Sequence, residues 1–163
     1  MCIRDSLWRD LTPLEVTWRA GDDASAIGWH LGHQAAVAHY MVRNLTAAEP
    51  SPDPELDALM DSATAERDRG DLPKVDRIGD YRDAVAERVR FHINNIDSGN
   101  VGAPTQLRVI ANTLMTAVIN HEYQHSKWIG EVRSEQLGHD LPEVPSSDAV
   151  SYTHLTLPTI CSV

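Results

Sequence analysis

The sequence is poor in cysteine, aromatic residues and positive charge, and each shortage excludes a class of protein. Only two of the 163 residues are cysteines, Cys2 and Cys161, and they lie at opposite ends, so no disulfide framework can be read. The net charge of −10 argues against nucleic acid and anionic membrane surfaces as partners. No apolar run reaches the roughly 18 residues of a membrane span. With a single phenylalanine, the core must be mainly aliphatic.

The two ends of the chain resemble sequencing adapters rather than protein. Read back into codons, residues 1–6 give the transposase mosaic end of fragment libraries, and 150–159 give its reverse complement continuing into the adapter. We therefore expect adapter-derived segments at 1–6 and 150–163, with a helical domain at 7–149. Both cysteines fall in the adapter segments, so the domain has no thiol for catalysis or zinc binding. We also expect a gene fragment cut at both ends, which has lost its first helix and leaves open the loss of a further domain.

Helical periodicity dominates the remaining sequence. Apolar residues recur at intervals of three and four in three long segments, and a shorter helix is expected between the first two. The predicted helices are 26–45, 55–64, 75–96 and 104–137. Pro104 and Gly138 supply start and stop signals for the last of them. The sequence predicts an all-α protein, namely an up-down, antiparallel four-helix bundle with helix one largely lost to truncation.

Two histidines lie on the apolar seam of the last helix. The seam consists of Leu107, Ile110, Leu114, Val118, His121, His125, Trp128 and Val132. His121 and His125 are one turn apart on this predicted buried stripe, so their rings point the same way and one metal ion can bind both. An unpaired polar ring inside a bundle costs free energy, so two on one seam need a reason. The alternative is two core histidines, each hydrogen-bonded across the bundle.

A third ligand must come from another helix. The candidates are His30, His33, His39 and His92. Spacing does not separate His30 from His33, although Gly32 beside His33 permits a close helix approach. His92, on the stripe of its own helix, is a candidate for a supporting position. Three imidazoles without a thiolate suit zinc, iron, nickel or manganese, with a coordination position open to water or substrate.

The segment His121–His125 also spells the H-E-x-x-H signature of zinc proteases. The longer metzincin pattern fails, because Trp128 and Glu131 stand where glycine and histidine are required. No later helix supplies a glutamate ligand, and no sheet is available to hold a peptide. We therefore interpret Glu122, one position off the seam, as a neighbour of the ligands or a surface residue.

Three segments resemble the DinB-like superfamily of metal-binding four-helix bundles. They are Leu11–Arg19, Ile27–His33 and His121–His125, similar to that family's turn after helix one, its first ligand helix and its final helix. The resemblance spans nearly all of residues 7–141. It implies one ligand from helix two and two from helix four, which favours His33 over His30 and adds His121 and His125.

A narrower likeness is to the N-terminal domain of ergothioneine-type sulfoxide synthases, which are iron-dependent. The similar segments are Trp29–His33, Arg67–Pro73 and Tyr81–Arg82. Loop arginines of those enzymes hold the carboxylates of a thiol substrate, so the likeness implies that Arg67 and Arg69 bind substrate. The alternative is a solvated loop with local ion pairs to Glu66, Asp68 and Asp71. Those synthases also carry a large second domain that completes their active site; it is absent from this sequence, which the expected truncation alone would explain.

These observations predict a cytoplasmic metalloprotein that acts on a small molecule through His33, His121 and His125. His30, His92 and Glu122 are expected around these ligands. Single-domain relatives are thiol-dependent transferases and isomerases, which implies a low-molecular-weight thiol as substrate. Two alternatives stay open: an N-terminal fragment of an iron-dependent sulfoxide synthase, and a non-catalytic bundle with a structural metal or histidine network. The oligomeric state is also left open, with a homodimer as one alternative.

Overall fold

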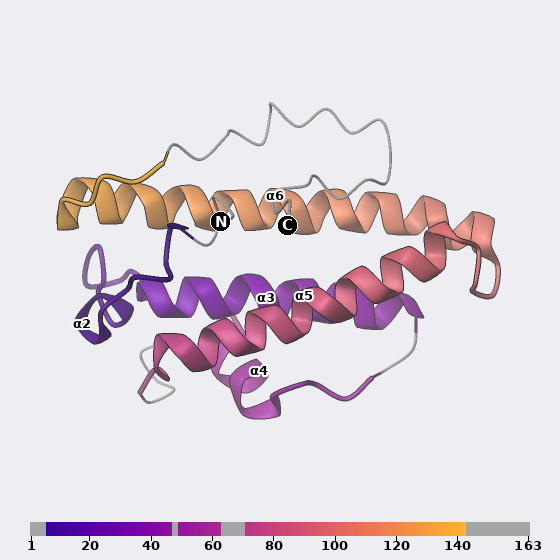
Figure 1. The fold of residues 1–163 in the computed structure, drawn as a ribbon, viewed down its shortest axis with the longest axis horizontal. Coiled ribbons are helices and arrows are strands. Elements are labelled where there is room, and N and C mark those ends of the chain that lie inside the picture. Colours follow the sequence, from indigo (N-terminus) through magenta and orange to yellow (C-terminus); the bar gives the residue numbers. More distant parts are fainter. Residues whose placement is uncertain (1–5, 47–48, 63–70, 143–163) are drawn as a thin grey trace.

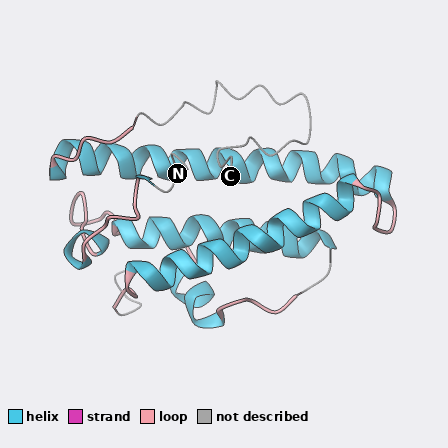
Figure 2. Cartoon of the chain, in the orientation of Figure 1, coloured by secondary structure: helices cyan, strands magenta, loops and turns pink. Residues whose placement is uncertain are grey.

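The computed structural model describes residues 6–46, 49–62 and 71–142. The helices are α2 (Pro13–Val16), α3 (Ile27–Thr46), α4 (Pro54–Met60), α5 (Val75–Asp97) and α6 (Pro104–Leu137), arranged as Figure 1 shows. Figure 2 draws the described chain as helices and loops, without a strand, which confirms the all-α prediction. Within the described ranges, none of the helices combines the length and the apolar composition that a membrane crossing requires.

The helix boundaries follow the local signals in the sequence. The three long predicted helices agree with α3, α5 and α6 to within one residue at either end, and Gly138 closes α6 in the left-handed conformation. The short helix predicted at 55–64 is shorter in the structure, where α4 ends at Met60. Helix α2 was not predicted, although its signal is present: Thr12 and Glu15 form a capping box.

Helices α3 and α5 run in the same direction, and α6 runs against both (Figure 1). Gly28 approaches Ile78, and the carbonyl of Leu31 accepts from Arg82, so residue numbers rise together along α3 and α5. The predicted antiparallel order therefore holds for α6 but is wrong for α3 relative to α5. The reason is the long connection between them, which includes α4 and returns along the bundle before α5 begins.

The core lies where the long helices meet. The predicted stripe of α5 is buried throughout and consists of Ile78, Tyr81, Val85, Val89, His92 and Ile96. On α3 the predicted positions Ile27, Leu31 and Ala35 are buried, while the side chains of Val42 and Leu45 lie outside the described set.

The predicted seam of α6 is only partly correct. Val118 and Val132 are buried, but Ile110 is 48% exposed and the buried positions near it are Ala111 and Met115. A straight α-helix drifts by about 20° per heptad relative to a 3.5-residue repeat. Over a helix as long as α6, an apolar stripe read with steps of three and four therefore leaves the contact face at one end.

A buried arginine joins the N-terminal segment to the end of α6. Arg133 is fully buried and donates to the carbonyl of Leu7 at 2.6 Å and to Asp10 at 2.9 Å. Beside it, His139 hydrogen-bonds to Glu15. Leu7 is itself only 2% exposed, whereas the predicted adapter segments, Ser6 apart, lie outside the described residues.

Candidate metal centre

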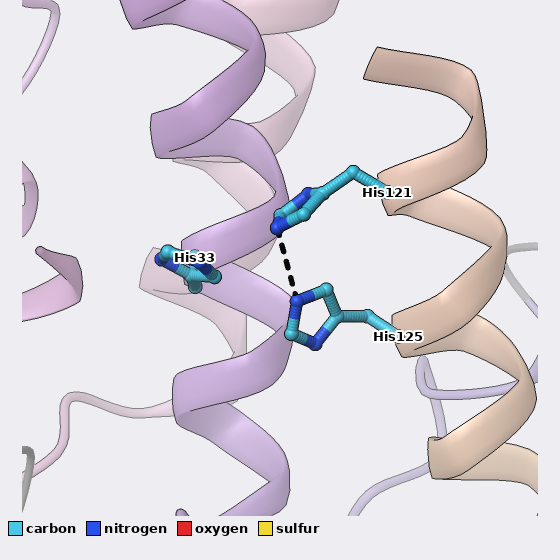
Figure 3. A group of neighbouring side chains, drawn as sticks. All are labelled: His33, His121 and His125. Atoms are coloured by element: carbon cyan, nitrogen blue, oxygen red, sulfur yellow. Dashed lines mark hydrogen bonds between the residues drawn. The ribbon is translucent and has the colours of Figure 1, made fainter. Parts of the chain in front are cut away.

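His33 on α3 and His121 and His125 on α6 form a compact group between these helices. One nitrogen of each ring lies within 4.8 Å of those of the other two. In Figure 3, His121 and His125 reach from α6 toward His33. The Nε2 atoms of His121 and His125 are 3.1 Å apart, close to the roughly 3.4 Å expected between two nitrogens bound to one tetrahedral zinc ion. The structure thus brings together the three residues selected from the sequence.

The orientation of His33 is fixed from both sides. Its Nδ1 lies 2.8 Å from the carbonyl oxygen of Met60, and because a carbonyl only accepts, Nδ1 must carry the proton. Nε2 of the neutral ring therefore keeps its lone pair for a ligand. Trp29 stacks on the same ring at a centroid distance of 4.3 Å. Gly32 permits this arrangement, because a Cβ there would lie 2.5 Å from Sδ of Met60.

His125 has a different partner. Its Nδ1 lies 2.7 Å from Nδ1 of His30, while its Nε2 faces His121. The ring of His30 also packs on Trp128 at a centroid distance of 4.0 Å. His30 is therefore next to the three-histidine group and contacts one member of it on the side away from the other two.

Burial keeps the rings of His30, His121 and His125 neutral near pH 7. Burial, followed by the charge of neighbouring imidazoles, lowers the pKa of His125 to about 3 and that of His30 to about 4. Burial also lowers the pKa of His121. His121 and His125 are half-buried rather than fully covered as the seam predicted. Neutral imidazole is the form that binds metals, so the donor set fits a divalent first-row ion.

Polar side chains link the helices behind the histidines. Arg82 on α5 donates to Gln34 and to Glu122, both at 2.7 Å. The amide nitrogen of Gln34 donates to the carbonyl of Glu122 at 2.9 Å and to Ser126 at 3.1 Å. We call these four residues the Arg82 network. Glu122, expected near the ligands, is thus engaged with a buried arginine.

Other predicted site residues lie elsewhere. His92 is buried on α5 and its Nε2 lies 3.2 Å from Glu49; it is ten residues, or about 15 Å of helix, from Arg82. His39 is buried on α3 and does not belong to the three-histidine group. Arg67 and Arg69 lie outside the described residues, so their predicted contact with substrate stays a prediction.

Sequence reasoning missed Gln34, Arg82, Ser126 and the carbonyl of Met60. A signal for Arg82 was present, since it lies four residues after Ile78 and three before Val85 on the buried stripe of α5. A charged residue at a core position needs a partner. No sequence pattern indicates the Met60 carbonyl, because any residue supplies one.

The chain belongs to the DinB superfamily, whose family profile matches residues 5–129. All three histidines lie inside the matched range, and members of this superfamily typically bind a metal ion. Searches of curated proteins and of solved structures gave no significant match. The narrower likeness to sulfoxide synthases therefore stays a prediction.

Proposed function

We propose that His33, His121 and His125 bind one divalent first-row metal ion. The observation that supports this most is the convergence of three ring nitrogens within 4.8 Å, contributed by two helices far apart in sequence. The hydrogen bond from His33 to Met60 leaves the inward nitrogen of that ring as a lone-pair donor. Membership of the DinB superfamily supports the same assignment.

We further propose that the metal acts on a small molecule, with a low-molecular-weight thiol as substrate or co-substrate. A divalent ion held by three imidazoles keeps a coordination position open and lowers the pKa of a water or thiol bound there. The chain's own contribution is to hold the three imidazole rings in place. The thiol is proposed from the resemblance to thiol-dependent transferases.

Metal content tests the site. The whole chain, purified without chelator, should carry about one ion per chain by elemental analysis. His33→Ala, His121→Ala and His125→Ala should each lose most of it, because the remaining two imidazoles bind weakly. His39→Ala is the matched control: it removes a buried histidine of α3 outside the group and should keep the metal.

The same measurement can overturn the proposal. Metal-free wild-type chain that also fails to take up Zn²⁺, Co²⁺, Fe²⁺, Ni²⁺ or Mn²⁺ on dialysis would exclude the site. Unchanged metal content in His121→Ala, with helicity intact, would exclude this ligand set.

A non-catalytic bundle is the second candidate. It is favoured by the hydrogen bonds that His33 and His125 already make with Met60 and His30, because these give one nitrogen of each ring a partner without an ion. X-ray absorption of the loaded protein separates the two. A water ligand that added thiol replaces supports the enzyme. A coordination shell made of protein ligands alone, unchanged by added thiol, supports the structural role. Bound iron with thiol-dependent oxygen uptake would instead indicate the sulfoxide synthase alternative.

A further inference from the structure

The residue that follows each of the three histidines belongs to the Arg82 network. Gln34 follows His33, Glu122 follows His121, and Ser126 follows His125. The hydrogen bonds of Gln34 and Arg82 join these three positions to one another across α3 and α6. The network therefore fixes the backbone of α3 relative to α6 at the level of the histidines.

Arg82 contributes this connection from a third helix. It lies on α5, which supplies none of the three histidines, and it is 3% exposed. One end of its guanidinium donates to the Leu31 carbonyl and to Gln34 on α3, and the other to Glu122 on α6. The ring of Trp8 covers the group at 5.5 Å. A planar fork with several donors makes such a bridge, and a single ammonium does not reproduce it.

The Arg82 network is placed where it can control the separation of the three histidines. His33 and its two opposing histidines sit on different helices, so the distance between their nitrogens depends on how α3 and α6 are spaced and rotated. The network's hydrogen bonds involve the residue directly after each histidine. They therefore control the spacing and the rotation of the two helices at the level of the rings. Helix packing alone tolerates shifts that metal coordination does not.

We propose that Arg82 is a positioning residue for the metal centre and that, through Gln34 and Glu122, it sets the separation of His33 from the His121–His125 pair. This inference rests on the proposed metal site. It predicts that loss of the network weakens metal binding and distorts coordination in protein that is still folded, without removal of any ligand.

Cobalt(II) titration of the whole chain tests this, because the visible absorption of Co²⁺ reports coordination geometry. Arg82→Met should weaken Co²⁺ and Zn²⁺ binding by about 10- to 100-fold, the usual effect of removing a residue that supports ligands. Its Co²⁺ spectrum should change as well. Arg82→Lys keeps the charge and should recover part of the affinity. Gln34→Met retains the Arg82–Glu122 pair and should show the same spectral change with a smaller loss.

Arg133→Met is the matched control. Arg133 is also a buried arginine, but its partners Leu7, Asp10 and Glu15 contact it at the far end of α6. It should lower stability while leaving the Co²⁺ affinity and spectrum of the folded protein unchanged. Wild-type spectra and affinities in folded Arg82→Met, or in Gln34→Met if Arg82→Met does not fold, would overturn the inference. So would an equal change in Arg133→Met. Wild-type chain that binds neither metal would overturn the proposed function itself.

Discussion

Nδ1 of His30 lies 2.7 Å from Nδ1 of His125, so each ring presents the same nitrogen to the other. Two neutral imidazoles can share such a contact only if one donates and the other accepts. When His125 donates, its Nε2 keeps the lone pair and faces His121. His30 then fixes the tautomer of a ligand without binding the metal, the role that a carboxylate, carbonyl or water usually has beside a metal-bound histidine.

His30→Ala should retain about one metal ion per chain but lower its affinity by roughly tenfold. The three ligands stay, while the acceptor that selects the His125 tautomer is lost. Competition with a chromophoric zinc chelator measures the change.

His30→Gln offers a matched comparison, because an amide oxygen can still accept a hydrogen bond. It should bind more tightly than His30→Ala. Complete loss of metal in His30→Ala would make His30 a ligand and contradict the assignment of His33 in its place.

The stability of the metal-free protein should fall as the pH drops from about 6.5 toward 4. Burial and the neighbouring imidazoles lower the pKa of His30 to about 4 and of His125 to about 3 in the folded chain. In the unfolded chain both pKa values are near 6.5. Below that pH the unfolded state binds protons that the folded state does not bind, so the free energy of unfolding falls. Above it, these two groups contribute no pH dependence.

Urea unfolding in chelator at successive pH values measures this effect. Carboxylates do not obscure it, because the pKa of Glu15, which burial would raise, is lowered to about 2 by hydrogen bonds from Thr12 and His139. Its contribution is therefore lost only below about pH 4.5. His125→Ala should reduce the slope of unfolding free energy against pH between pH 6.5 and 4.5. A flat wild-type profile in this range would contradict the lowered pKa values of His30 and His125.

Helix α5 shows why much of the fold could be predicted, because the residues that define this helix follow a local pattern in the sequence. Its buried positions recur every three or four residues from Ile78 to Ile96, and Asp97 and Gly99 mark its end. The direction of α5 relative to α3 could not be predicted in the same way. It depends on how the chain from Thr46 to Val75 is routed, and no periodicity encodes that route.

The site divides along similar lines. The pairing of His121 and His125 follows from one helical turn and needs no tertiary information. The choice between His30 and His33 does need it, because only the packed helices show that His33 lies against both His121 and His125, whereas His30 lies against His125. Family resemblance selected His33, and Arg82 became recognisable only when three helices were seen together.

Gly32→Ala should weaken metal binding and lower stability. A methyl group there would meet Sδ of Met60 at 2.5 Å, and relieving such overpacking costs about 1–3 kcal/mol. The higher helix propensity of alanine offsets up to about 1 kcal/mol of this. Since the Met60 carbonyl orients His33, a displaced Met60 also disturbs that ring.

Gly21→Ala serves as the control, because nothing lies within 4 Å of its Cβ position. Thermal unfolding and zinc competition on both variants measure the difference. Equal metal affinity in Gly32→Ala and wild type would mean that Met60 does not control His33.

Removal of residues 1–5 and 150–163 should leave the melting temperature unchanged. If these segments derive from sequencing adapters, they were never selected to pack against the domain. The deletion stops before Leu7, whose side chain is buried and whose carbonyl accepts from Arg133. Differential scanning calorimetry of trimmed and full chains decides the matter. A loss of several degrees would contradict the adapter interpretation.

Arg133→Met should destabilise the protein by about 1–3 kcal/mol, since the carbonyl of buried Leu7 loses its donor, while the largely exposed Asp10 returns to water. Arg133 is fully buried and holds Leu7 and Asp10 against α6. Arg77→Met makes an instructive comparison, because Arg77 also forms two ion pairs, with Asp53 and Glu55, but its own side chain is 47% exposed. Water replaces those contacts, so its loss should matter much less. Urea unfolding of both variants in chelator measures the contrast, and an equal loss in the two would show that burial does not set the strength of the Arg133 contacts.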